Sequence, residues 1–293
     1  MNKLRYFSHP LATLVPRDLL LLESLRPSPS DDALEIGTGS GTSLFRMAGS
    51  TRTLDGVDVS KGALDRLRHA LSLRNGETHN VRLFCLDFCE PSAANQLPIP
   101  YSLIFSCDTM EHVPNPRLFL ANVCSALRPG GRAFITFPNE TPAQAHGITY
   151  FEHRSELEEL LRAAGFDPSE TEIQTLRMNP SAERIMRLGW QIPRRAAKSL
   201  LRRLRGHREA PQTFEATDYF AYADRAEPLA PLINGYCWSL MRLMAMAEPV
   251  YYIEPAPEIL WDTQVLIRTR RAKEPVDPVG NGDLTSLCRE GGI

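Results

Sequence analysis

One segment constrains the fold more than any other: residues 33–42, which read Ala-Leu-Glu-Ile-Gly-Thr-Gly-Ser-Gly-Thr. A short apolar run enters a turn with glycines at alternate positions, and an amphipathic segment follows. Glycines allow positive φ and let a ligand approach backbone N–H groups directly. Asp58 ends the next apolar run, 21 residues after Gly37, where a carboxylate can accept hydrogen bonds from ribose hydroxyls. This strand–loop–helix unit predicts a nucleoside-containing cofactor.

The same alternation of short apolar runs and longer amphipathic segments continues along the chain. It is typical of a parallel sheet covered by helices on both faces. We therefore expect a doubly wound, Rossmann-like α/β fold with a mostly parallel seven-stranded sheet and an antiparallel last strand. The predicted strands are Ala33–Gly37, Thr53–Val59, Val81–Leu86, Leu103–Ser106, Arg132–Phe137, Ser169–Leu176 and Thr263–Thr269. The predicted helices of this domain are Thr42–Ala48, Lys61–Arg74, Pro116–Leu127 and Ser155–Ala164.

These patterns divide the chain into four parts. Residues 1–30 form a helical segment, and residues 31–177 with 261–271 form the cofactor-binding domain. Residues 178–260 carry helical patterns and prolines but no clear strand, so we expect a helical insertion that acts as a substrate lid. Residues 272–293 are turn-rich and are expected to be a flexible tail.

Composition excludes several classes of protein. The hydrophobic fraction of 43% argues against wholesale disorder, and the net charge of -2 gives no global reason to bind nucleic acid. Six cysteines without a Cys-x-x-Cys pair indicate neither a zinc site nor a disulfide framework. The apolar run at 19–22 is too short for a secretion signal or a membrane span, so we expect a cytoplasmic protein.

The glycine loop also discriminates between cofactors. It has the pattern G-x-G-x-G rather than the G-x-G-x-x-G of dinucleotide-binding dehydrogenases, and Glu35 precedes it. A carboxylate there would repel a pyrophosphate but suits a sulfonium cation. The sequence resembles the class I S-adenosylmethionine-dependent methyltransferases that carry an E-x-G-x-G-x-G loop. The resemblance covers roughly residues 30–177 and the strand near 265, and its segments are Leu54–Ser60, Leu86–Phe88, Tyr101–Pro114 and Leu127–Ile135.

This resemblance implies S-adenosylmethionine as cofactor and methyl transfer to an oxygen or nitrogen of a small, apolar or amphipathic molecule. Asp58 would hold the ribose, Asp87 the adenine amino group, and Phe88 the adenine ring. The cofactor-binding residues that it implies are Glu35, Gly37, Thr38, Gly39, Gly41, Asp58, Val59, Asp87, Phe88, Cys107 and Asp108.

Three residues are candidates for the acceptor side. A hydroxyl acceptor needs a general base, and His112 and His146 are the two candidates. His146 and Tyr150 follow the predicted fifth strand and are the polar candidates to contact substrate. An amine that arrives neutral needs no base.

Two alternatives stay open. Asp108, Glu111 and His112 resemble the acid-x-x-Glu-His loop that helps hold a divalent metal in methyltransferases of the ubiquinone pathway, although the first acid here is the shorter Asp. We expect no metal, but the metal-assisted O-methyltransferase remains an alternative. A non-catalytic protein that binds S-adenosylmethionine is the other.

The predicted insertion has two unusual stretches. Residues 184–208 are rich in arginine and lysine without an acid, so the part at 194–205 could contact an anionic membrane, although a solvated helix face is the more common explanation. Residues 229–247 are apolar nearly all round and predict a buried lid helix. The oligomeric state is unknown.

Overall fold

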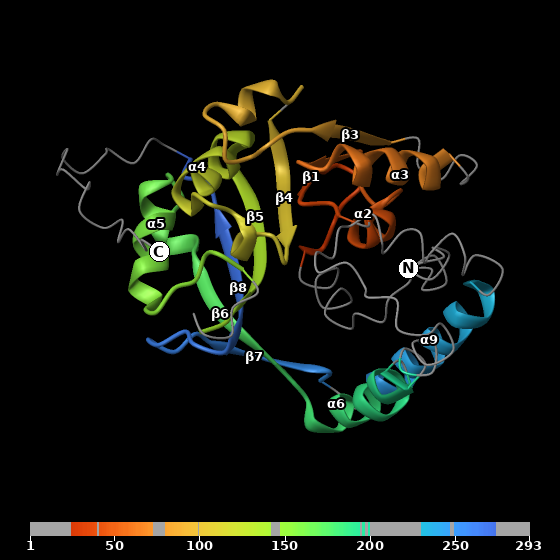
Figure 1. Cartoon of the computed structure of the whole chain (residues 1–293). Coiled ribbons are helices and arrows are strands. Elements are labelled where there is room, and N and C mark those ends of the chain that lie inside the picture. The colour runs from red at the N-terminus through yellow and green to blue at the C-terminus, as the bar shows by residue number, and fades with distance from the viewer. Residues whose placement is uncertain are drawn as a thin grey trace.

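The computed structural model describes residues 25–39, 41–72, 80–98, 100–141, 147–193, 195–196, 199, 230–246 and 249–273. Its centre is an eight-stranded sheet with the order β3-β2-β1-β4-β5-β8-β6-β7 (Figure 1). The strands are β1 (Asp32–Ile36), β2 (Thr53–Asp58), β3 (Val81–Cys85), β4 (Tyr101–Cys107), β5 (Leu127–Asn139), β6 (Glu172–Met178), β7 (Tyr251–Pro255) and β8 (Thr263–Arg270). Strands β1 to β5 pair in parallel, whereas β8 is antiparallel to both β5 and β6, and β7 is antiparallel to β6.

Helices cover both faces of the sheet. The longer ones are α2 (Thr42–Met47), α3 (Lys61–Ser72), α4 (Pro116–Ala126), α5 (Arg154–Ala163), α6 (Pro180–Met186) and α9 (Ala230–Ala245). Short helical turns are η2 (Ala93–Gln96), η3 (Met110–His112), η4 (Pro168–Glu170) and the π-helical η5 (Arg187–Gln191). Because side chains alternate along a strand, neighbouring strand residues enter two separate cores. One core packs α4 and α5 against the sheet, and the other packs α2, α3, α6 and α9.

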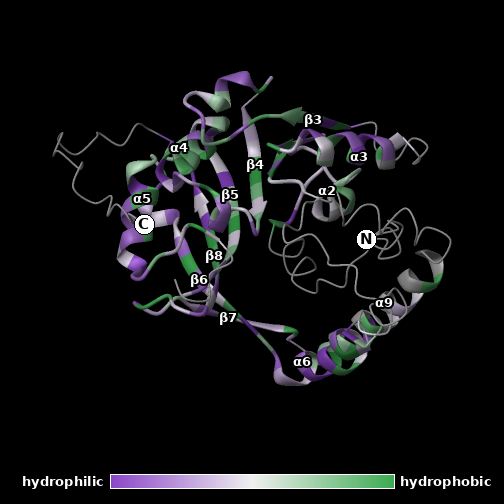
Figure 2. Cartoon of the chain, viewed as in Figure 1, coloured by the Kyte–Doolittle hydropathy of each residue, from purple (hydrophilic) through white to green (hydrophobic). Residues whose placement is uncertain are grey.

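The central strands explain this arrangement. β1 is buried along its whole length, and so is β4 except at Cys107. Continuous apolar burial is what a parallel strand covered on both faces requires, and Figure 2 shows these strands as largely hydrophobic. The doubly wound fold predicted from the sequence is therefore confirmed.

Within the described residues the sheet has eight strands, one more than the seven predicted. The additional strand, β7, lies within the segment 178–260, where no clear strand was expected. β7 ends the sheet and pairs on one side, with β6. Its residues are half-buried or exposed and it ends at Pro255, so it lacks the continuous apolar run that marks a strand covered on both faces. β7 thus occupies residues 251–255 of the segment that was predicted to be a helical insertion.

Some predictions lie on residues outside the described part of the chain. These include most of the segment 1–30, the tail from 274 and most of the basic stretch beyond 193. Among the described residues, no helix is both long enough and apolar enough to cross a lipid bilayer.

Candidate active site

The glycine loop lies at the edge of the sheet where the parallel strands end. Backbone N–H groups of Gly37 and Thr38 donate to the Val57 carbonyl oxygen, over 2.8 and 3.2 Å. The N–H of Gly39 donates to Asp58 Oδ2 over 2.8 Å, and that of Ser60 donates to Asp58 Oδ1 over 2.8 Å. The Asp58 carboxylate therefore holds the loop after β1 against the loop after β2, and lies beside the turn that the sequence assigned to the cofactor.

The three glycines of the loop have different physical reasons to be glycine. All have positive φ, at 79° for Gly37, 48° for Gly39 and 74° for Gly41. A Cβ at Gly37 would lie 2.1 Å from Thr109 Oγ1, and one at Gly41 would lie 2.4 Å from Leu67 Cδ1. At Gly39 a Cβ would meet no atom within 4 Å. Gly37 and Gly41 are thus required by packing, whereas Gly39 faces open space into which a ligand can approach the backbone.

The other predicted cofactor residues differ in exposure. Glu35 and Thr38 are buried, and Thr38 Oγ1 has no hydrogen-bond partner within the described part of the chain. Asp87 is exposed, and its Oδ1 accepts from the N–H of Cys89 over 2.8 Å. The orphaned hydroxyl of Thr38 and the open face of Gly39 are what a loop that holds a polar ligand would show.

Two apolar residues next to the site face different ways. Phe88, predicted to contact the adenine ring, is only 3% exposed and packs edge-on against Phe119, with ring centroids 6.3 Å apart. Val59, directly after Asp58, is 65% exposed. Val59 is therefore the side chain that offers apolar surface beside Asp58, while Phe88 supports the core beneath.

The loop after β4 turns sharply at Asp108. Its φ of 50° lies in the left-handed region, and its N–H donates to the Thr136 carbonyl oxygen over 2.8 Å. Gln264 of β8 extends its Nε2 to within 3.4 Å of Asp108 Oδ1. Gln264 lies on β8, which is separated from β4 by β5. The contact therefore joins two strands that are not neighbours and could not be predicted from the sequence. Cys107, immediately before the turn, is half-buried.

The two loops predicted to lie on the acceptor side are hydrogen-bonded to each other. The Glu111 carbonyl oxygen accepts from the N–H groups of Ile148 and Thr149 over 2.7 and 3.0 Å, and Thr149 Oγ1 donates to the Val113 carbonyl oxygen over 2.6 Å. His112 lies in the first loop with 58% of its side chain exposed, and its Nε2 is 3.7 Å from Glu111 Oε1. The imidazole is therefore accessible at the same edge as the glycine loop.

An aromatic pair that the sequence analysis missed adjoins these loops. Tyr150, 44% exposed, has its ring centroid 5.7 Å from that of Trp261, which lies just before β8. Asn139, fully buried at the end of β5, holds both segments: its Nδ2 donates to the carbonyl oxygens of Phe151 and Leu260, each over 2.8 Å. The pairing depends on tertiary contacts, and the sequence signal for Trp261 was only its position before a strand.

Two further predictions concern the acceptor side, the role of His146 and the metal alternative. His146 lies outside the described residues. Across the part of the chain that the structure describes, no three His, Cys, Asp or Glu side chains form a group that could hold a metal ion. Asp108, Glu111 and His112 are therefore not gathered around one point.

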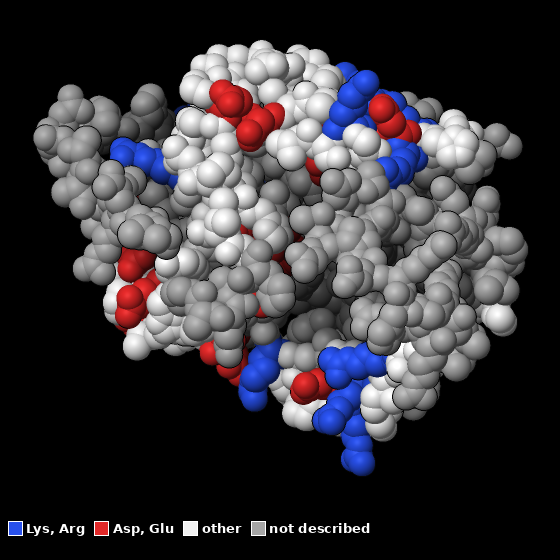
Figure 3. Space-filling view, viewed as in Figure 1, with Lys and Arg blue, Asp and Glu red and all other residues white. Residues whose placement is uncertain are grey.

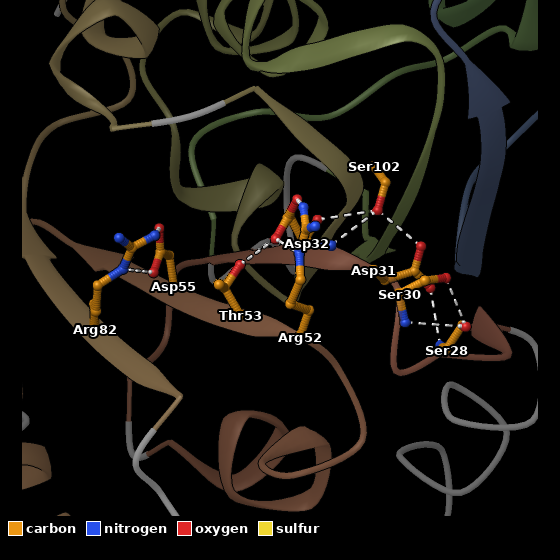
Figure 4. A network of polar contacts seen from close by, with 9 residues as sticks. All are labelled: Ser28, Ser30, Asp31, Asp32, Arg52, Thr53, Asp55, Arg82 and Ser102. Carbon is orange, nitrogen blue, oxygen red and sulfur yellow. Dashed lines mark hydrogen bonds and ion pairs between the residues drawn. The ribbon is translucent and has the colours of Figure 1, made fainter.

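A polar network occupies the opposite edge of the sheet (Figure 4). Asp32 accepts from Arg52 and Thr53, and the hydrogen bond from Arg52 holds the pKa of Asp32 below its usual value. Asp55 is fully buried on β2 and accepts two hydrogen bonds from Arg82, over 2.7 and 2.8 Å. These groups are paired with one another at the ends of strands remote from the glycine loop, so we interpret the network as structural.

Comparisons with known proteins agree with this geometry. A family model described as a methyltransferase domain matches residues 34–133, which include the glycine loop, Asp58 and the loop after β4. A structure of a candidate sarcosine dimethylglycine methyltransferase from Galdieria sulphuraria superposes with a TM-score of 0.50 and 12% identity over 88% of this chain and 84% of that one. Residues 34–133 therefore form a methyltransferase domain, as the resemblance to the class I S-adenosylmethionine-dependent methyltransferases implied. Its cofactor is S-adenosylmethionine.

Curated relatives of this methyltransferase carry a more specific name. A ubiquinone biosynthesis O-methyltransferase from Aeromonas salmonicida is 33% identical over 110 residues, which are 37% of this chain and 44% of the relative. One from Thiobacillus denitrificans is 25% identical over 179 residues, 55% of this chain and 75% of the relative. The match thus spans less than half of the first relative.

The fold alone does not determine the reaction. The [4+2]-cyclase SpnF shares the methyltransferase fold with a TM-score of 0.52 and 18% identity, over 88% of this chain and 81% of that one. A protein named for cyclisation thus has the same architecture, and the acceptor chemistry must be argued from the site.

Proposed function

We propose that this methyltransferase transfers a methyl group to a hydroxyl oxygen of a small, largely apolar acceptor. The observation that carries the proposal is the accessible imidazole of His112 at the same sheet edge as Gly39 and Asp58. The names of the curated relatives, which are O-methyltransferases, support oxygen as the acceptor atom. The aromatic pair of Tyr150 and Trp261 offers the apolar surface.

The chain's own residues would align and deprotonate the acceptor. S-adenosylmethionine, when bound, supplies a methyl group on an already activated sulfonium sulfur. Gly39 and Asp58 would hold the cofactor at the loop, with Val59 as apolar contact. His112 would accept the hydroxyl proton, because an accessible imidazole is the side chain that most often acts as a general base. Tyr150 and Trp261 would orient the acceptor and exclude water from it.

The test is a methyl-transfer assay with tritiated S-adenosylmethionine and two matched probes, 4-hexylphenol and 4-hexylaniline, which differ in the acceptor atom alone. We expect label on the phenol and little on the aniline. His112→Ala should lower turnover of the phenol by about a hundredfold or more, the usual contribution of a general base. His69→Ala, an exposed histidine on α3, is the control and should retain full activity. Label on the aniline alone would overturn the choice of oxygen.

Further variants separate cofactor binding from catalysis. Asp58→Ala should weaken S-adenosylmethionine binding about ten- to a hundredfold in calorimetry, because ribose hydroxyls would lose their acceptor. We also propose that no metal takes part, so turnover should survive dialysis against EDTA. Activity that disappears with EDTA and returns with Mn²⁺ or Mg²⁺ would favour the metal-assisted alternative. Tight cofactor binding with no turnover of either probe would favour a non-catalytic protein.

A further inference from the structure

A pair of helices projects from the same edge of the sheet as the active site. β6 runs parallel to β5, because both are antiparallel to β8, so α6 leaves the sheet where β1, β2, β4 and β5 also end. The chain returns through α9 to β7, which begins at this edge because Tyr251 pairs with Met178 (Figure 1). We call α6, η5 and α9 the helical hairpin.

The two arms of the helical hairpin pack closely. A Cβ at Gly189 of η5 would lie 2.5 Å from Leu240 Cδ2 of α9, so the glycine permits the close approach. The Tyr236 hydroxyl donates to the Gly189 carbonyl oxygen. Leu240 and Met244 are buried in the core beneath. The inner side of the helical hairpin therefore has its partners within the chain.

The outer side of the helical hairpin is apolar and exposed. Five exposed residues of α9 and of the turn after it recur four and three positions apart, at Leu232, Tyr236, Ser239, Leu243 and Met246, with Gly235 and Arg242 also exposed. The spacing of the five places them along one side of the helix. Met246 is 80% exposed, Leu232 73% and Leu243 49%. On η5 and just beyond it, Leu188 and Ile192 are 57% and 47% exposed. We call Leu188, Ile192, Leu232, Leu243 and Met246 the outer face.

Charges around the outer face are predominantly positive. Exposed arginines are Arg184, Arg187, Arg195 and Arg242, whereas Glu183 is the single acid among the described residues of 180–196 and 230–246. Figure 3 shows blue atoms gathered at the end of the molecule where Figure 1 places α6, with a smaller red area beside them. Beyond these described residues the sequence continues with Arg194, Lys198, Arg202, Arg203 and Arg205 on the η5 side, and with one acid, Glu248, after α9.

We propose that the outer face binds peripherally to the surface of an anionic lipid membrane. Exposed apolar side chains on a helix, flanked by arginines, match the chemistry of a bilayer interface: the side chains enter the acyl boundary and the guanidinium groups contact lipid phosphates. The same surface would be a poor contact between two copies of this chain, because a two-fold axis would bring its arginines together. Docking in this way would place the active-site edge next to the membrane.

Vesicle co-sedimentation of the full chain tests this proposal. Vesicles of phosphatidylcholine alone are compared with equimolar phosphatidylcholine and phosphatidylglycerol. We expect binding to the anionic vesicles that is at least about tenfold stronger than to the neutral ones and that falls in high salt. Leu243→Glu combined with Met246→Glu should lower binding to anionic vesicles by at least about tenfold. No vesicle binding by the unmodified chain would overturn the proposal.

A matched control separates the outer face from general charge. Asn95→Asp combined with Gln96→Glu adds the same two negative charges on η2, at exposed positions, and should bind vesicles like the unmodified chain. Equal loss in this control would overturn the proposal. Leu243→Ser with Met246→Ser adds no charge, and should also weaken vesicle binding if the apolar side chains enter the lipid. Unchanged calorimetric affinity for S-adenosylmethionine shows that each variant is folded.

Size-exclusion chromatography with light scattering tests whether a second copy of this chain, rather than a membrane, binds the outer face. The mass of the unmodified chain without vesicles is compared with that of the Leu243→Glu, Met246→Glu variant. A dimer that becomes a monomer in the variant, together with no vesicle binding, would overturn the proposal in favour of a second copy. An equal mass for both proteins, with vesicle binding lost in the variant, supports the membrane.

Discussion

Tyr101 is the residue whose contribution to stability can be isolated most cleanly. Its hydroxyl is buried and donates to Asp55 over 2.5 Å, while Asp55 also keeps two hydrogen bonds from Arg82. Tyr101→Phe should therefore lower the free energy of unfolding by about 1.5–3 kcal/mol, the range for a hydrogen bond to a charged group. Urea unfolding followed by circular dichroism measures it. Tyr150→Phe, whose ring is exposed, should stay within about 0.5 kcal/mol.

The Tyr101 hydrogen bond also gives a pH dependence of known sign. Burial, and then the hydrogen bond to Asp55, raise the pKa of Tyr101 above its ordinary value. The folded phenol stays protonated where the unfolded phenol ionises, so the stabilisation is complete below about pH 10 and is lost as pH rises further. The difference between unmodified chain and Tyr101→Phe should shrink from about pH 7 to about pH 11. A constant difference would contradict the assignment.

Single residues also show where sequence reasoning succeeded and where it stopped. Gly39 and Asp58 could be placed because a glycine turn after a strand and an acid at the end of the next strand are local patterns. Trp261 and Gln264 could not, because their neighbours Tyr150 and Asp108 lie more than a hundred residues earlier. The resemblance implied that Phe88 contacts the adenine ring. Its packing against Phe119 in the core is a tertiary contact that the sequence did not indicate.

At the level of elements, two substitutions in the glycine loop separate an effect on stability from an effect on cofactor binding. Gly37→Ala and Gly39→Ala share the cost of a side chain at positive φ, about 1–2 kcal/mol. Gly37→Ala should cost more than this because its Cβ would overlap Thr109. Gly39→Ala should lose affinity for S-adenosylmethionine by about a hundredfold, since its Cβ would occupy the space into which the cofactor approaches. Calorimetry and urea unfolding of both variants measure the two effects.

The outcome that would contradict the loop assignment is normal cofactor binding by Gly39→Ala. Equal losses of stability in the two variants would instead show that Thr109 moves aside without cost. The comparison is direct because the two positions are two residues apart in one turn. It therefore tests the ligand-facing role of Gly39 with its neighbour as control.

Elements were predictable where their patterns are local. The strands β1 to β4 and the helices α2 to α4 follow the alternation read from the sequence, because their apolar side chains are buried or, as in β3, partly buried. β7 was missed because a strand at the end of a sheet, paired on one side, needs no regular apolar pattern. The segment 229–247 was expected to be a buried lid helix. The helix is present as α9, but Leu232 and Leu243 are exposed, so apolar composition did not establish burial there.

At the scale of the whole molecule, β7 changes how the helical hairpin can be removed. The Asn179 N–H donates to the Val250 carbonyl oxygen over 2.9 Å, so the chain leaves and re-enters the sheet at adjacent points. Residues 180–249 can thus be replaced by a short Gly/Ser linker that keeps β6 and β7 paired. The deletion removes the buried contacts of Ala182, Leu240 and Met244, so a lower free energy of unfolding is expected.

The deletion tests the proposal that the helical hairpin serves the acceptor rather than the cofactor. The hydrogen bonds that hold the glycine loop to Val57 and Asp58 involve no residue of 180–249. Affinity for S-adenosylmethionine should therefore stay within about tenfold, or about 1.4 kcal/mol. Turnover of 4-hexylphenol should be lost if the helical hairpin covers the acceptor as a lid and excludes water. Binding to anionic vesicles should be lost as well, because the outer face is gone.

Turnover and vesicle binding of the deletion test two separate proposals, because either can be lost without the other. A folded deletion with full turnover would overturn the lid while leaving the membrane proposal to the vesicle assay. One that still sediments with anionic vesicles would locate lipid binding elsewhere in the chain. Loss of cofactor affinity by far more than tenfold, in a protein that circular dichroism shows to be folded, would mean that the helical hairpin shapes the cofactor site too. The Leu243→Glu, Met246→Glu variant changes the exposed side chains of the helical hairpin and leaves the buried Leu240 and Met244 in place. It therefore separates the effect of the outer face from the effect of losing the packed helices.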